Sequence, residues 1–101
     1  MNEHKLISLL GLAQKAGKVS SGEFAIEKAV RSGKARMILV AADATANSKK
    51  SYTDLARYYE VNCYEVLSKE VIGTAIGKSA RAAVTVTDMG FSKAILEVLN
   101  T

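Results

Sequence analysis

The sequence predicts an α/β protein in which helices cover both faces of a central sheet. Two patterns in its 101 residues lead to this prediction. In five segments, apolar residues recur at spacings of three and four, which is typical of amphipathic helices. Between these segments lie short apolar or alternating runs, which are typical of strands. Such an alternation of helices and strands favours helical layers on either side of a sheet. The length predicts a single domain, residues 1–101.

Each expected helix has an apolar face and a residue suited to begin it. The faces, in chain order, are Leu6, Leu9, Leu10 and Ala13; Ile26, Ala29 and Val30; Tyr52, Leu55, Ala56 and Tyr59; Val71, Ile72, Ala75 and Ile76; and Phe91, Ala94, Ile95, Val98 and Leu99. The expected N-terminal caps are Asn2, Ser21 with Gly22, Ser48, Ser68 and Asp88. Gly17 is expected to end the first helix in the left-handed conformation.

Four segments are expected to be strands. They are Val19–Ser21, Met37–Ala42, Cys63–Val66 and Ala82–Thr87. Met37–Ala42 is continuously apolar and partly β-branched, which predicts burial on both faces of the sheet. Gly73 and Gly77 are four residues apart in an amphipathic segment, and this spacing predicts close packing rather than a membrane dimer.

Charge and cysteine content limit the class of protein. Lys and Arg total 14 and Asp and Glu total 10, and the net charge of +4 permits a nucleic-acid partner without requiring one. The single Cys63 excludes an internal disulfide and a multi-cysteine metal site. The longest apolar run, Met37–Ala42, is far shorter than the roughly 20 residues of a membrane span. We therefore expect a cytoplasmic protein without a membrane anchor, and a monomer, because a chain of this length can close one core.

The residues that could carry catalysis are few. His4 is the only histidine, and we expect it at the surface near the N-terminus. Cys63 opens a short apolar strand, where a free cysteine is usually a small buried hydrophobe. Asp43 follows a buried strand, where it could serve a ligand or, more commonly, a turn or cap. Neither glycine-rich phosphate-binding motif is present. The sequence predicts a protein that is not an enzyme, with no cofactor and no metal ion.

Two short basic segments have the composition of binding sites. Ser20-Ser21-Gly22 leads into an expected helix N-terminus, where backbone N–H groups and the helix dipole attract phosphates. Lys15 and Lys18 precede this turn, and Lys28 follows it. Gly77–Arg81 is a second small, basic loop. Together they suit a phosphate or a bent nucleic-acid backbone, and the alternative is that both are ordinary solvated turns.

Six segments in order also carry a family resemblance. They are Leu9–Lys18, Ser21–Glu23, Lys28–Lys34, Leu39–Ala44, Ala75–Lys78 and Val86–Phe91. In these segments the chain resembles the L7Ae/L30e superfamily of kink-turn-binding ribosomal proteins, and most of all its small bacterial YlxQ-like branch. The resemblance implies a three-layer α-β-α sandwich around a mixed four-stranded sheet. It also implies a ribonucleoprotein component, connected with translation, that binds kinked RNA or ribosomal RNA.

The resemblance further implies where RNA binds. In this superfamily the N-terminal turn of the second helix enters the widened groove of a kinked RNA, and a loop before the last strand covers a flipped-out base. Gly22 matches the glycine of that turn, Lys28 matches the lysine after it, and Gly77–Ala82 matches the covering loop. The expected RNA-binding residues are Lys15, Lys18, Ser21, Gly22, Glu23, Lys28, Gly77, Lys78, Ser79, Ala80 and Arg81.

Phe24 and Ala25 depart from the superfamily pattern. Kink-turn binders carry at these two positions a polar pair that reads sheared G·A base pairs. Phosphate contacts from the basic residues do not depend on that pair, and they give affinity with little sequence specificity. The alternative function is a protein-interaction module that kept the fold, with an exposed Phe24 as an anchor for a partner. A plainer alternative is that Phe24 packs beneath the first helix.

Overall fold

The computed structural model describes residues 1–101, in which helices and strands alternate as predicted. In chain order the elements are α1 (Glu3–Lys15), β1 (Val19–Ser21), α2 (Glu23–Arg31), β2 (Met37–Val40), α3 (Ala46–Tyr58), β3 (Asn62–Glu65), α4 (Lys69–Ala75), β4 (Ala83–Val86) and α5 (Met89–Leu99). None of these helices combines the length and the apolar character needed to cross a lipid bilayer.

The four strands form one mixed sheet in the order β1-β4-β2-β3. β2 and β3 are parallel, since α3 carries the chain back between them. β4 is antiparallel to both β1 and β2, and Val86 therefore lies opposite both Val19 and Met37. This order makes β1 and β3 the edges of the sheet and puts β4, which comes last in the chain, in its interior.

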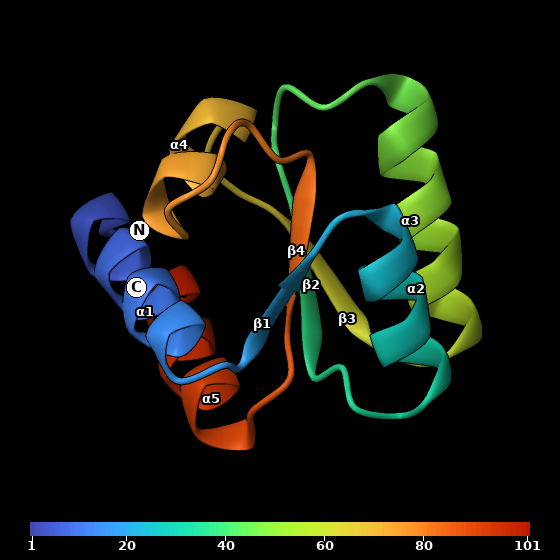
Figure 1. Ribbon diagram of the computed structural model, residues 1–101, viewed down its shortest axis with the longest axis horizontal. Coiled ribbons are helices and arrows are strands. Elements are labelled where there is room, and N and C mark those ends of the chain that lie inside the picture. The colour runs from blue at the N-terminus through green and yellow to red at the C-terminus, as the bar shows by residue number, and fades with distance from the viewer.

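The sheet lies between two layers of helices, as Figure 1 shows. α2 and α3 cover one face, and α1, α4 and α5 cover the other. Every residue of β2 and β4 is buried, which confirms burial on both faces for Met37–Val40. The strand is shorter than the predicted Met37–Ala42, and Ala42 is exposed beyond its end. The Thr85 hydroxyl in this core donates to the Met37 carbonyl oxygen at 2.7 Å, so the polar group is satisfied. The predicted three-layer sandwich around a mixed four-stranded sheet is confirmed.

Four of the five helices begin at a residue whose side chain caps the first turn, and two of the predicted caps are corrected by the structure. Three helices are capped as predicted, by Asn2, Ser68 and Asp88. The prediction of Ser48 as the cap of α3 was wrong, because Thr45 has the extended backbone of a cap and its Oγ1 accepts from the Ser48 N–H at 3.1 Å. α2 is capped by the backbone of Gly22 alone, because Ser21 is still paired in β1.

Candidate nucleic-acid interface

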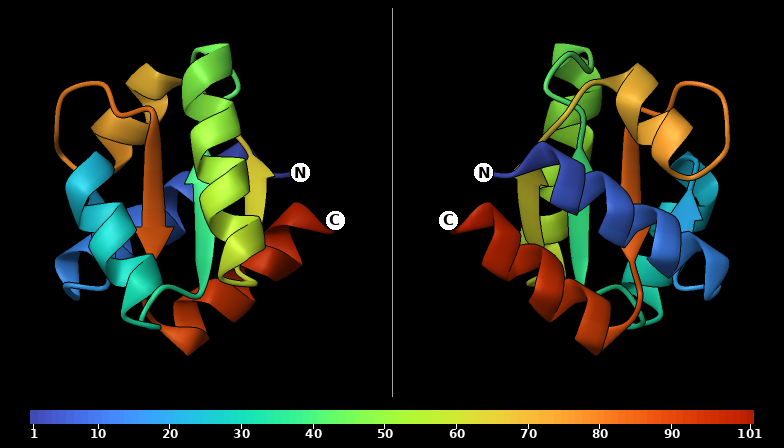
Figure 2. Two further views of the ribbon diagram at one scale, coloured as in Figure 1. Left: turned by 90° about the vertical axis from the view of Figure 1, so that its right-hand side faces the viewer. Right: turned by 90° about the vertical axis from the view of Figure 1, so that its left-hand side faces the viewer.

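The pairing of β1 with β4 brings the two predicted basic segments together. Ser21, the last residue of β1, pairs with Val84 near the start of β4. The turn into α2 follows Ser21, and the Gly77–Ala82 loop leads into β4. Both segments therefore lie at the same end of this strand pair, and the left view of Figure 2 shows the loop beside the N-terminal turn of α2.

Arg81 connects the two segments through hydrogen bonds. Its Nε donates to Ser21 Oγ at 3.4 Å, across 60 positions of the chain. Its Nη1 donates to Ser79 Oγ at 2.8 Å and to the carbonyl oxygens of Ser79 and Ala80, each at 3.1 Å. The Arg81 N–H donates to the Lys69 carbonyl oxygen at 3.0 Å, which ties the loop to the start of α4. The Nη2 group takes part in none of these bonds, so Arg81 can shape the loop and still offer a donor to a ligand.

The first turn of α2 is open to a ligand. α2 is the only one of the five helices whose N-cap residue makes no side-chain hydrogen bond to the first turn. Gly22 has φ +90° and ψ 143°, a conformation that favours glycine, and apart from its chain neighbours no residue has an atom within 4 Å of where a Cβ would be. The first-turn N–H groups can therefore donate to an anion at the positive end of the helix dipole.

The α4–β4 loop folds back over the helix that precedes it. Gly77, two residues beyond the end of α4, has a φ of +72° and turns the chain back, and the Lys78 N–H donates to the Gly73 carbonyl oxygen at 2.8 Å. The Ser79 carbonyl then passes directly over Gly73, where a Cβ would overlap its oxygen and lie 2.6 Å from its carbon. The predicted close packing is thus confirmed at Gly73, whereas Gly77 serves the left-handed turn and has open space where a Cβ would be. Sequence reasoning did not identify Gly73 as a support of the candidate interface.

The predicted lysines divide into two groups. Lys78 is exposed in the same loop as Arg81, and Lys28 is exposed on α2. Lys15 and Lys18 are also exposed, but the Lys18 carbonyl oxygen accepts from the Thr87 N–H at 2.9 Å, just beyond the end of β4. This pair lies at the opposite end of β1 from the loop, about 10 Å away along a three-residue strand. Lys15 and Lys18 therefore extend the basic surface and do not join its centre.

The side chains of Glu23 and Phe24 leave α2 on different sides. Phe24 is 82% exposed, which rules out the alternative that it packs beneath the first helix. Phe24 and Lys28 line the same shallow hollow on the outer side of α2. Glu23 instead lines a groove between α2 and α3. Only the N–H of Glu23 belongs to the open first turn, whereas its carboxylate faces α3.

The other candidates from the sequence have structural positions. His4 is exposed on α1, as predicted. Cys63 is half-buried in β3, and burial raises the pKa of its thiol. Asp43 Oδ1 accepts from the Lys69 N–H at 2.8 Å, so Asp43 helps to begin α4, in agreement with the cap interpretation. The backbone of Lys69 thus donates to Asp43 and accepts from Arg81. No motif in the sequence indicates that Lys69 connects these two residues.

Comparison with known proteins identifies the family of this chain. Residues 4–96 match the Ribosomal protein L7Ae/L30e/S12e/Gadd45 family, and the chain belongs to it. It is 44% identical over 92 residues to the RNA-binding protein YlxQ of Bacillus subtilis, covering 91% of this chain and 92% of that protein. It is 40% identical over 98 residues to the RNA-binding protein YlxQ of Enterococcus faecium, covering 97% of this chain and 94% of the relative.

A solved structure of a protein of unknown function from Bacillus halodurans has the same fold. It superimposes with a TM-score of 0.91 at 33% identity, covering 96% of this chain and 98% of that chain. The resemblance to the L7Ae/L30e superfamily and its YlxQ-like branch is thus confirmed. The family and the names of the relatives are those of non-enzymatic proteins, which confirms the prediction that the chain is not an enzyme.

Proposed function

We propose that this protein binds structured RNA with a kinked backbone, through the first turn of α2 and the Gly77–Ala82 loop. Membership of the L7Ae family and two relatives named as RNA-binding proteins support RNA as the ligand. The proposed targets are cytoplasmic, with ribosomal RNA or the ribosome among them, because the family description is that of ribosomal proteins.

The observation that carries this proposal is the bond between Arg81 and Ser21. It holds a helix N-terminus with free donors and a basic loop at one end of the sheet. A straight backbone can follow either segment, but a sharply bent one can contact both. Phosphates would bind the first-turn N–H groups, Lys28 and Lys78, while the loop covers an unstacked base. Both segments come from one chain, so the proposed complex needs only a monomer.

Phe24 changes how this surface would recognise RNA. A phenyl ring cannot form the hydrogen bonds by which a polar side chain reads a base edge. It offers instead an exposed face at the first turn of α2, and unstacked bases stack well on such faces, with about 1–3 kcal/mol per base. The proposed specificity is therefore for RNA shape and an unstacked base, with little direct reading of sequence.

The proposal is tested by titrating a kink-turn RNA with the wild-type protein and three variants at two salt concentrations. Lys78→Ala should lower the slope of log K against log salt by about 1, because one phosphate contact is lost. Phe24→Ala should weaken binding by roughly fivefold or more at both salts, because stacking is not ionic. Lys93→Ala, which removes an exposed lysine of α5, is the matched control. If Lys93→Ala weakens binding as much as Lys78→Ala does, the assignment of the interface is wrong.

A protein-interaction module is the second candidate function, and the 82% exposure of Phe24 favours it. An exposed aromatic ring is a common anchor of protein interfaces. In that case Phe24→Ala leaves RNA affinity unchanged and abolishes capture of a stoichiometric protein partner that resists nuclease treatment. Loss of RNA affinity with unchanged protein capture contradicts this second function.

A further inference from the structure

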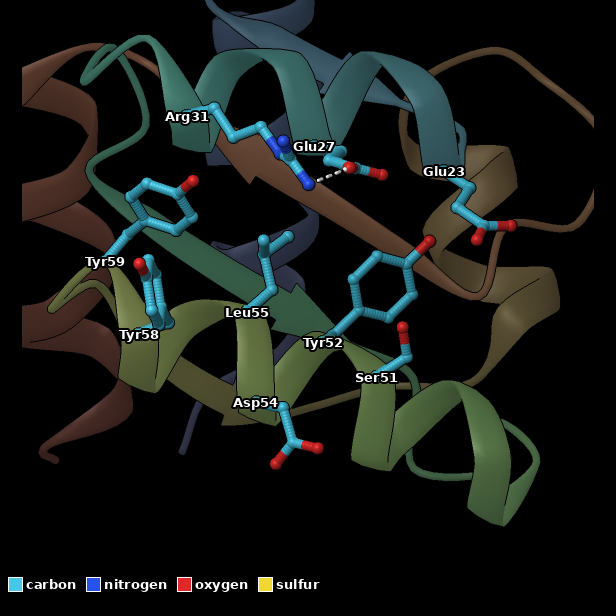
Figure 3. Close-up of a pocket in the computed structure, with 9 residues that line it drawn as sticks. All are labelled: Glu23, Glu27, Arg31, Ser51, Tyr52, Asp54, Leu55, Tyr58 and Tyr59. Atoms are coloured by element: carbon cyan, nitrogen blue, oxygen red, sulfur yellow. Dashed lines mark ion pairs between the residues drawn. The ribbon is translucent and has the colours of Figure 1, made fainter.

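The groove between α2 and α3 carries a charge opposite to that of the whole chain. Figure 3 shows this groove, which has a volume of about 520 Å³. Glu23 and Glu27 contribute two carboxylates to its lining and Arg31 contributes one guanidinium, whereas the whole chain has a net charge of +4. Asp54 also lines the groove, but its carboxylate points away from α2 in Figure 3. The groove is therefore suited to a cationic ligand and unsuited to an RNA backbone.

One carboxylate of the groove has no cationic partner. Glu27 Oε1 pairs with Arg31 Nη2 at 2.7 Å, and Asp54 pairs with Lys50 at 2.8 Å. None of the ion pairs of the chain includes Glu23. The Glu27–Arg31 pair is largely exposed and joins residues one helical turn apart, a kind of pair that contributes little to stability. Glu27 can therefore exchange Arg31 for another cation at little cost.

The remaining lining of the groove is aromatic and aliphatic. In Figure 3 the Tyr52 hydroxyl points toward the Glu23 carboxylate, and Leu55 lies between Tyr52 and the pair formed by Tyr58 and Tyr59. The rings of Tyr58 and Tyr59 meet edge to face, with centroids 4.9 Å apart, and Tyr58 is 80% exposed. Such rings bind cations with their faces, and Leu55 can receive the aliphatic part of a long side chain.

One cationic side chain of the protein itself, Arg31, already lies in this groove. Its side chain extends from α2 into the groove on the side of Tyr59, and its guanidinium meets the Glu27 carboxylate there. The half of the groove between Glu23, Tyr52 and Leu55 holds no corresponding cation. This half has the same chemistry as the half that Arg31 enters, namely a carboxylate above aromatic and aliphatic side chains.

We propose that the α2–α3 groove binds an arginine-containing segment of a partner protein, with one guanidinium between the carboxylates of Glu23 and Glu27. These residues are four positions apart on one helix, so they lie on the same face about 5–6 Å apart. A guanidinium carries five N–H donors in a planar fork and can bond two carboxylates while its plane rests on a ring. The nine residues of α2 span about 13 Å, the length of about four extended residues.

The test is an NMR titration of the full chain, labelled with ¹⁵N, with an acetylated and amidated tetra-arginine peptide. The matched peptide has citrulline in place of arginine, which keeps the shape and removes the charge. Amide shifts should be confined to α2 and α3, and the citrulline peptide should cause none. Glu23→Gln and Glu27→Gln should each raise the apparent Kd about three- to fivefold, and Tyr58→Ala about two- to fivefold.

Glu97→Gln, which neutralises an exposed carboxylate of α5, is the control and should bind as the wild type does. Shifts spread over the whole surface, equal binding of the citrulline peptide, or equal weakening by Glu97→Gln would overturn the proposal. So would a concentration-dependent dimer that the peptide dissociates, because a second copy of the chain would then be the occupant. The titration contains no RNA, so its failure leaves the proposed RNA interface untouched.

Discussion

Replacement of Gly73 by alanine should displace the loop of the proposed RNA interface. The new Cβ would overlap the Ser79 carbonyl oxygen and lie 2.6 Å from its carbon and 3.0 Å from Ala80 Cα. Carbon atoms in contact are about 3.5–4.0 Å apart, so the loop has to move by roughly 1 Å. The atoms in the way belong to the backbone, and no side-chain rotation can relieve the overlap.

The free energy of unfolding should fall by about 2 kcal/mol in Gly73→Ala. An extra methyl group in a packed site costs about 1–3 kcal/mol, and we expect the upper end because backbone atoms are involved. This cost is partly offset, because alanine stabilises a helix by about 1 kcal/mol relative to glycine. A net loss of about 2 kcal/mol lowers the Tm of a chain of this size by roughly 8–16 °C.

Urea unfolding and RNA titration together measure this effect. The control is Thr74→Ala, which changes an exposed neighbour on the same helix without an overlap. Gly73→Ala should lose both stability and RNA affinity, because the loop that Arg81 shapes is displaced, whereas Thr74→Ala should keep both. A Gly73→Ala protein as stable as the wild type would refute the account of how the loop packs on α4.

Three further predictions concern a cap, the response to alkali and the interface itself. Thr45→Ala should lower the free energy of unfolding by about 1 kcal/mol in urea, whereas Ser48→Ala should have little effect; the reverse order would contradict the assigned cap. Burial, reinforced by the Glu23 charge, raises the pKa of Tyr52, and burial also raises the pKa of Cys63. Both groups keep their protons in the folded state after the unfolded chain ionises, so stability should fall above about pH 8.5 and continue to fall through the raised folded pKa values. Urea unfolding at about pH 7.5 and about pH 10 measures this loss of stability. The loss should be smaller in Cys63→Ala, and equal stability of the wild type at the two pH values would contradict the prediction. Arg81→Lys keeps the charge but replaces the planar fork, whose Nε and Nη1 bond Ser21 and Ser79, with a single nitrogen, so RNA affinity should fall by about tenfold. Wild-type affinity of this variant would show that charge alone suffices.

The fold was predictable because its signals are local. The apolar spacing of each helix, the continuous run at Met37–Val40 and the caps at Ser68 and Asp88 depend on residues close together in the chain. The cap of α3 was less predictable, because Thr45 and Ser48 are both hydroxyl residues and lie three positions apart. Only the packing of the helix on the sheet decides between them.

The candidate interface was predictable only in part. The sequence indicates two basic segments, but their meeting depends on the pairing of β1 with β4, elements at opposite ends of the chain. The bond between Arg81 and Ser21 and the passage of the Ser79 carbonyl over Gly73 are consequences of that pairing. The exposure of Phe24 likewise depends on which face of α2 packs on the sheet, where Ile26 and Val30 are buried.

In the proposed function, the first turn of α2 and the Gly77–Ala82 loop together recognise a bent RNA. This recognition is tested most directly by titrating the protein with a kink-turn RNA and with a straight duplex of equal length, at the same two salt concentrations. We expect clearly tighter binding of the kinked RNA at both salt concentrations, with Phe24 in place. Equal and weak binding of both RNAs that falls steeply with salt would contradict it, because only a basic surface would then remain.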